Sequence, residues 1–169
     1  MNAISLRVTT TDDAASVSAV LAASYPALLA SAYDPDVLGR ALPLMTKANP
    51  KLLASGTYYL AEAVAGVAVG CGGWTRERPG SGEIENGLGH IRHFGVRPDW
   101  SGRGVGRTLL ERCIREARAA GVAEFEAYST LNGEPFYAAL GFEPIGRFDV
   151  AMGPGASLPS VIMRRALAD

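Results

Sequence analysis

Apolar and polar positions follow two different periods along the chain, and together they predict strands and helices in mixed order. Short runs rich in β-branched and aromatic residues predict strands over 3–8, 90–96 and 123–129. The stretch 57–74 predicts a hairpin that turns near Val64–Gly66. Two further strands are expected in the closing runs FEPIGRFDV and PSVIMRRAL. Strands therefore gather in the middle and at the end of the chain.

Helices are predicted where apolar residues recur every three or four positions. The segment 104–120 shows this most clearly, because one face carries only apolar side chains, namely Val105, Leu109, Leu110, Cys113, Ile114 and Ala117. Another helix is expected after the Thr/Asp-rich start signal at 9–13. A second helical stretch near 35–54 should be broken at Pro43 and Pro50. Helices and strands together indicate a mixed α/β (α+β) fold.

Length and charge limit the class of protein. A chain of 169 residues with 48% hydrophobic content is expected to form a single domain over 1–169. Sixteen Lys and Arg against seventeen Asp and Glu leave a net charge of −1, so no overall field favours nucleic acid or an acidic membrane as a partner. Neither a signal-peptide pattern nor the ~18 consecutive apolar residues of a membrane span is present, which predicts a cytoplasmic protein.

Thiol, serine and metal chemistry find little support in the sequence. Cys71 and Cys113 belong to no CxxC pair and are interpreted as buried thiols. A G-x-S-x-G elbow is absent, which disfavours a serine hydrolase. The two histidines, His90 and His93, lie three residues apart on one strand, and no Cys, His or Asp completes a metal site around them. A protein without a metal is expected.

The segment WSGRGVGR (100–107) stands directly before the clearest helix and predicts an anion site. The first amides of a helix have no intrahelical partner, and the helix dipole adds partial positive charge there. The loop glycines Gly102, Gly104 and Gly106 let a ligand approach the backbone, and Arg103 and Arg107 add charge. A tight strand-to-helix turn is the alternative. Since neither P-loop nor dinucleotide-binding glycine spacing fits, a pyrophosphate group is the expected ligand.

Two segments resemble those of a known family, the GCN5-related N-acetyltransferases (GNAT). VRPDWSGRGVGRTLL (96–110) is similar to the family's acetyl-CoA loop, and PFYAALGFE (135–143) is similar to its FYxxxGF segment. The resemblance is concentrated in Ile91–Glu143. It implies a single GNAT-like domain with a mixed central sheet of about six to seven strands and about four flanking helices, and acetyl-CoA as co-substrate.

The resemblance also implies which residues bind the co-substrate. The backbone of Phe94, Gly95 and Val96 is expected to pair with the pantetheine arm. The pyrophosphate is expected on the amides of the following loop, which are those of Gly102, Arg103, Gly104, Val105, Gly106 and Arg107. Ser101 departs from the family pattern, which often has Arg or Gln there. This departure removes one side-chain contact and leaves the backbone amides in place.

Acetyl transfer to an amine needs a base and an acid. A primary amine with a pKa of ~10 is mostly protonated at neutral pH, and the departing thiolate needs a proton. In the family the acid is commonly a tyrosine in the segment that FYAALGF resembles, which points to Tyr137. A packed tyrosine in the core is the alternative. Tyr137 lies in a short predicted helix that begins at Pro135 and ends before Gly141.

His90 is preferred to His93 as the base. Strand alternation places these two side chains on opposite faces unless a bulge intervenes. His90 lies six residues before Val96, where several family members resemble one another in placing a base. A structural histidine and bulk water remain alternatives, as do Glu83 and Glu85 in the polar loop before the strand.

The resulting hypothesis is an N-acetyltransferase that moves the acetyl group of acetyl-CoA to a primary amine by direct attack in a ternary complex. The acceptor is a small molecule or a protein, and the resemblance also allows a homodimer through the C-terminal strands. A non-catalytic acyl-CoA-binding sensor is the alternative function. The helices within 11–54, the loop 76–89 and the closing strands are expected to choose the acceptor.

Overall fold

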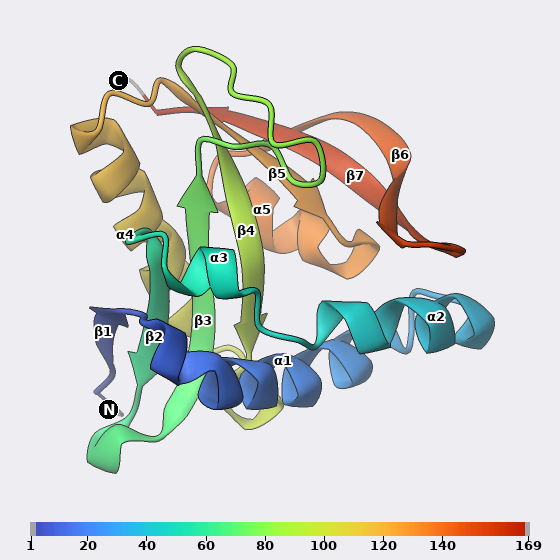
Figure 1. Cartoon of the computed structure of the whole chain (residues 1–169), viewed down its shortest axis with the longest axis horizontal. Helices are drawn as coiled ribbons and strands as arrows, with labels where there is room; N and C mark the ends of the chain where they lie inside the picture. Colours follow the sequence, from blue (N-terminus) through green and yellow to red (C-terminus); the bar gives the residue numbers. More distant parts are fainter. Residues whose placement is uncertain (1–2, 168–169) are drawn as a thin grey trace.

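The computed structural model describes residues 3–167, which form one mixed sheet of seven strands in the order β1-β2-β3-β4-β5-β7-β6 (Figure 1). The strands are β1 (Ser5–Val8), β2 (Tyr58–Glu62), β3 (Ala68–Thr75), β4 (Leu88–Val96), β5 (Glu124–Ser129), β6 (Glu143–Gly153) and β7 (Ala156–Ala166). The helices are α1 (Ala14–Leu29), α2 (Pro35–Met45), α3 (Pro50–Leu53), α4 (Val105–Ala119) and α5 (Glu134–Ala139). The predicted mixed sheet with flanking helices is confirmed.

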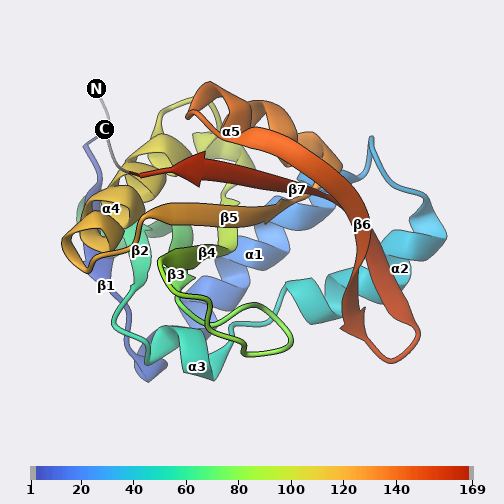
Figure 2. The ribbon, with the colours of Figure 1, turned by 90° about the horizontal axis from the view of Figure 1, so that it is seen from above.

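Helices cover both faces of the sheet and bury one apolar core on each. The helices α1, α2 and α3 lie on one face, and α4 and α5 lie on the other (Figure 2). All six apolar residues predicted on one face of α4 are buried. Cys71 is buried in the core under α1 and Cys113 in the core under α4, both as free thiols. Burial raises the pKa of the Cys71 thiol to about 12, so it stays protonated and inert at neutral pH.

The helical stretch near 35–54 differs from the prediction at its first proline. Pro43 lies inside α2, and the break falls instead between Met45 and Pro50, which starts α3. A proline inside a helix removes one backbone hydrogen bond. Burial of Leu38 and other side chains on one face of α2 offsets that loss, so packing holds the helix through the proline.

The strands β4 and β5 separate part of the way along the sheet. They pair in parallel only from Leu88 with Glu124 to His90 with Glu126. Beyond that point β5 continues to pair with β7, while β4 continues to pair with β3. Pairing with β5 also extends β4 back to Leu88, so the polar loop is two residues shorter than the predicted 76–89. The separation leaves one edge of β4 without a neighbouring strand.

A bulge interrupts β4 within the separated part. Gly73 pairs with Arg92 and Cys71 pairs with Gly95, so Gly72 alone stands opposite both His93 and Phe94. His93 has a positive φ of 53°, which is unusual for a residue other than glycine. A side chain at Gly72 would meet the Phe94 ring at 2.6 Å, so glycine is required opposite the bulge. At the bulge, the side chains of His93 and Phe94 therefore depart from the regular alternation between the two faces of the sheet.

Candidate active site

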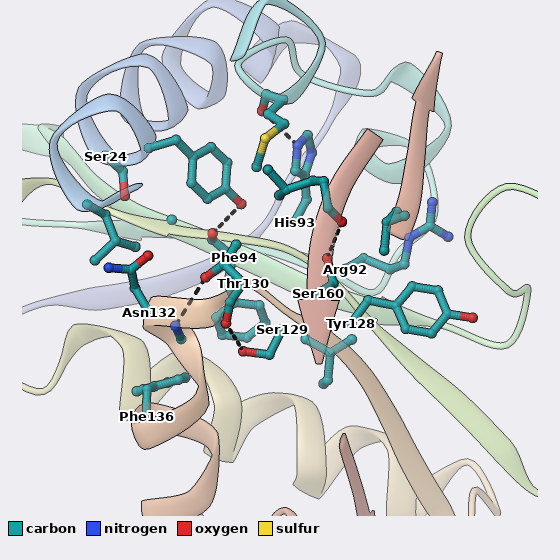
Figure 3. A pocket seen from close by; sticks show the side chains of 18 of the residues that line it. Ser24, Arg92, His93, Phe94, Tyr128, Ser129, Thr130, Asn132, Phe136 and Ser160 are labelled. Atoms are coloured by element: carbon teal, nitrogen blue, oxygen red, sulfur yellow. Dashed lines mark hydrogen bonds between the residues drawn. The ribbon is translucent and has the colours of Figure 1, made fainter. Parts of the chain in front are cut away.

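The separation of β4 and β5 opens a cavity of about 770 Å³. One wall is β4 from Ile91 to Val96, and the other is the end of β5 with the segment that leads into α5. Figure 3 shows Asn132 and Phe136 on one side of this space and Arg92 and Tyr128 on the other. Side chains of α1, α2 and the β6–β7 hairpin also line the cavity.

The glycine-rich loop meets α4 at Gly104, which is the N-terminal cap of that helix. Gly102 and Gly104 have positive φ values of 75° and 83°, and nothing lies within 4 Å of a side chain added at either position. The first hydrogen bond of α4 runs from the Thr108 amide to the Gly104 carbonyl, so the preceding amides lack intrahelical partners. This geometry leaves the amides open, as the predicted anion site requires.

The side chains of this loop have different surroundings. Val105 is the first residue of α4, and its side chain is buried, so only its backbone contributes to the loop surface. Gly106 lies close to Phe136, whose ring would be 3.0 Å from an added side chain. The guanidinium of Arg103 lies 5.0 Å from the centre of the Trp100 ring, and Arg107 forms an exposed ion pair of 3.5 Å with Glu111. The cavity reaches this loop at Ser101 and Gly106.

The unpaired edge of β4 is held by side chains of α1. The Tyr25 hydroxyl donates a hydrogen bond of 2.6 Å to the Phe94 carbonyl (Figure 3). The Val96 amide donates one of 3.3 Å to the Ser24 hydroxyl. Gly95 is buried between them, with Leu21 3.0 Å from the position of an added side chain. These three residues line the cavity. A pantetheine arm that paired with this edge would share the Phe94 carbonyl with Tyr25 and replace Ser24 as the acceptor at the Val96 amide.

The Tyr25 hydrogen bond gives a prediction about stability. Tyr25→Phe removes the donor from a partly buried carbonyl and keeps the ring, so the free energy of unfolding should fall by about 1 kcal/mol. Urea denaturation measures this change. Tyr128→Phe is the control, because the Tyr128 hydroxyl has only a 3.5 Å contact with Arg78, and its loss should change stability little. Equal stability of Tyr25→Phe and the unmodified protein would contradict the role given to this bond.

His93 lines the cavity at the bulge. Its Nε2 lies 2.9 Å from the Met45 carbonyl, which can only accept, so Nε2 carries the proton and Nδ1 keeps its lone pair (Figure 3). Burial lowers the pKa of the His93 imidazole, so the ring is neutral at pH 7. The Tyr58 hydroxyl donates to the His93 carbonyl at 2.7 Å, which fixes the backbone of the bulge.

His90 lies in a different environment from the one expected of a base. It is 1% exposed, does not line the cavity, and its Nδ1 is 3.5 Å from the Glu126 carboxylate. Arg164 pairs with the same carboxylate at 2.8 Å, and burial lowers the pKa of His90. His93 is one of the two bulge residues, and it, rather than His90, lines the cavity. The placement therefore reverses the preference drawn from the sequence.

Tyr137 lies in α5 at the wall of the cavity. Its ring packs edge-on against Phe136 and Phe142, with ring centres 5.1 and 5.3 Å away. Within residues 3–167 the Tyr137 hydroxyl has no hydrogen-bond partner. Burial raises the pKa of this hydroxyl, so it remains protonated well above neutral pH. The ring is thus fixed by packing, while its hydroxyl is left without a protein partner.

Asn132 is a site residue that the sequence reasoning missed. It lines the cavity, and its buried amide oxygen Oδ1 has no partner in the described part of the chain. Its Nδ2 makes one long contact of 3.4 Å with the Ser31 hydroxyl. A polar amide just after a strand and before the Tyr137 helix was the signal that could have found it. A buried unpaired oxygen favours a ligand that donates a hydrogen bond.

No group of three or more His, Cys, Asp or Glu side chains that could hold a metal occurs in residues 3–167. The helices in this part of the chain are all too short or too polar to cross a membrane.

Comparisons with known proteins agree with this geometry. The model of the acetyltransferase (GNAT) domain matches residues 54–144, which is more than half of the chain. A mycothiol acetyltransferase of Kineococcus radiotolerans is 40% identical over 86 residues, covering 49% of this chain and 25% of that protein. An IAA acetyltransferase of Azospirillum brasilense is 35% identical over 82 residues, covering 48% of this chain and 46% of that protein. The chain therefore aligns with less than half the length of these curated relatives.

Solved structures extend the likeness to the whole fold. A GCN5-related N-acetyltransferase from Rhodopseudomonas palustris has a TM-score of 0.80 and 25% identity, covering 98% of this chain and 97% of that one. The PaiA N-acetyltransferase of Thermoplasma acidophilum, solved with coenzyme A, has a TM-score of 0.72 and 16% identity over 97% of this chain and 99% of that one. With the family model matched over its sheet and glycine-rich loop, the chain belongs to the GNAT acetyltransferase family.

Proposed function

We propose that this protein is an N-acetyltransferase that transfers the acetyl group of acetyl-CoA to a primary amine of a small molecule or protein. One observation carries this proposal: a single cavity joins the glycine-rich loop, the unpaired edge of β4 and the Tyr137 hydroxyl. The curated relatives, a mycothiol acetyltransferase and an IAA acetyltransferase, support acetyl transfer as the reaction class.

The residues around the cavity suit acetyl-CoA, which supplies an activated thioester when bound. The open amides after Gly102 and Gly104 would hold the pyrophosphate, since no side chain occupies the space above them. The backbone of Phe94 to Val96 would hold the pantetheine arm, and the unpaired Asn132 oxygen would accept a hydrogen bond from one of its amides. The separated edge of β4 offers room for an extended ligand.

Two side chains of this cavity would move protons. Neutral His93 has a free Nδ1 lone pair at the bulge and is placed to accept a proton from the acceptor ammonium, directly or through water. Tyr137 keeps its proton at neutral pH and is placed to donate it to the departing thiolate. Bulk water remains the alternative to His93, and the buried pair of His90 with Glu126 would support the floor of the site.

The experiment that tests the function is a screen of amine acceptors with acetyl-CoA and detection of released thiol. We expect thiol release that requires both the amine and the protein, together with an acetylated amine identified by mass spectrometry. Binding of acetyl-CoA by calorimetry runs in parallel. Tight binding with no turnover on any amine class would favour the non-catalytic sensor instead.

A further inference from the structure

The charges around the cavity are unbalanced. Among the described residues that line it there is no Asp or Glu, and the only permanently charged side chain is that of Arg92. His93 is also titratable, but burial lowers its pKa and keeps it neutral at pH 7. A cavity without a carboxylate offers no partner to a second cationic group on an acceptor. The acceptor must therefore suit one fixed positive charge and an otherwise neutral wall.

The Arg92 guanidinium is held in place but not neutralised. Its Nη1 donates to the Thr75 hydroxyl at 2.9 Å, and the same hydroxyl donates to the Glu77 carbonyl at 2.8 Å. Within residues 3–167, Nε and Nη2 of Arg92 have no hydrogen-bond partner, and no carboxylate lies within salt-bridge distance of the guanidinium. The Glu77 side chain attracts it from further away. Two donor nitrogens thus remain available to an anion.

The buried carboxylate of Glu126 does not serve as an anionic partner for Arg92. Glu126 is 3% exposed and is occupied by Arg164 at 2.8 Å, with Arg78 at 3.6 Å. Burial lowers the pKa of Arg92, which shows that the cation has lost part of its hydration, although it remains charged at neutral pH. An anionic group on a ligand would replace the lost hydration.

The position of Arg92 assigns it to the acceptor. It precedes Val96 by four residues and so lies roughly 10–13 Å further along β4 from the glycine-rich loop. Figure 3 shows Tyr128 on the same side of the cavity as Arg92, and neither residue belongs to a segment with a phosphate-binding pattern. The predicted pyrophosphate site and Arg92 are therefore separated along the β4 wall of the cavity.

We propose that Arg92 binds a carboxylate or comparable anionic group of the acceptor, so that the substrate class is an amine that also carries a negative charge. This inference rests on the proposed acetyltransferase function and names its substrate class. The amine would lie at the bulge near His93, with the anion at Arg92. The apolar side chains of Leu28, Leu44 and Met152 would contact the carbon skeleton of the acceptor that joins its amine to its anionic group.

A matched set of six-carbon acceptors tests the charge preference. We would compare 6-aminohexanoate, hexylamine and 1,6-diaminohexane, which differ at the far end in being anionic, neutral and cationic, and the shorter pair L-leucine and 3-methylbutylamine. Steady-state kinetics should give the highest kcat/KM to the carboxylate member of at least one set and the lowest to the diamine. A diamine that exceeds both others, or a carboxylate that never exceeds its neutral partner, would overturn the proposal.

Variants assign the preference to Arg92. Arg92→Gln should lower kcat/KM for the preferred carboxylate by roughly 10- to 100-fold, leave the neutral amine and the KM for acetyl-CoA nearly unchanged, and abolish the discrimination. Arg92→Lys keeps the positive charge but lacks the planar guanidinium, so it should retain part of the discrimination between charged and neutral amines. Arg112→Gln is the matched control, because Arg112 is also half-buried but lies on α4 and not in the cavity wall. An equal loss for charged and neutral amines in Arg92→Gln would refute the assignment.

Binding measurements separate this inference from the proposed function. With coenzyme A present, calorimetry would compare N-acetyl-6-aminohexanoate with N-hexylacetamide on the unmodified protein and on Arg92→Lys. Preferential binding of the anion that weakens in the variant supports the anion site even if no amine turns over, in which case the catalytic proposal alone fails. If amines are acetylated without preference for the anionic one, and substitution of Arg92 has no effect, the anion-site inference fails while the proposed acetyltransferase function stands.

Discussion

Tyr137→Phe should lower kcat by roughly 10²-fold or more while leaving acetyl-CoA binding almost unchanged. The variant removes only a hydroxyl that lacks a partner in the described chain, and it keeps the ring between Phe136 and Phe142. Stability should therefore change little, since no hydrogen bond within residues 3–167 is broken. Rates at saturating substrates, measured beside calorimetric binding of acetyl-CoA, check the prediction.

The pH dependence sharpens this test. The protonated tyrosine is the active form, and burial raises its pKa, so this acid stays available beyond the usual tyrosine range. The ratio of the kcat values of the unmodified protein and Tyr137→Phe should then stay constant from neutral pH to about pH 10. Tyr59→Phe is the control, because Tyr59 is buried outside the cavity wall. An unchanged kcat in a folded Tyr137→Phe protein would reduce Tyr137 to a packing residue and favour the sensor.

Gly104→Asp should weaken acetyl-CoA binding by about 100-fold. Space around Gly104 is open, so the first side-chain carbon of the new residue meets no protein atom. Aspartate is a favourable helix cap, and its carboxylate would bond the first amides of α4 that a phosphate otherwise needs. Its charge would also repel the pyrophosphate. Calorimetric titration of acetyl-CoA measures the loss.

Gly121→Asp provides a closely matched control for that variant. Gly121 has a φ of 86°, compared with 83° at Gly104, and it too has nothing within 4 Å of an added side chain. It lies just past the other end of α4, so it shares the backbone strain without the free amides. Gly121→Asp should lose stability but bind acetyl-CoA normally. Equal weakening by both variants would show that strain, and not the loop amides, causes the effect.

Local features of the sequence determined much of this site. The loop of Gly102 to Arg107 and the buried face of α4 depend on neighbours within one or two helical turns, which a sequence pattern records directly. The short helix around Tyr137 follows the same logic, with Pro135 in its first turn and Gly141 at a φ of 91° just past its end. The family resemblance rests on these same local segments, which is why it was visible without a structure.

Only the tertiary structure decided which groups meet in the cavity. The bulge that turns His93 into it depends on Gly72 across the strand and on hydrogen bonds involving Tyr25, Tyr58 and Met45. Each of these partners lies more than twenty residues from His93 in sequence, so no local pattern showed which histidine lines the cavity, and His90 was preferred for its spacing to Val96 in the family resemblance. The place of Arg92 in the cavity also could not be predicted from the sequence, because the absence of carboxylates around it depends on how the walls of the cavity assemble. Short-range patterns thus set the loop and helices, whereas the register of packed strands decided which histidine and which charged side chain line the cavity.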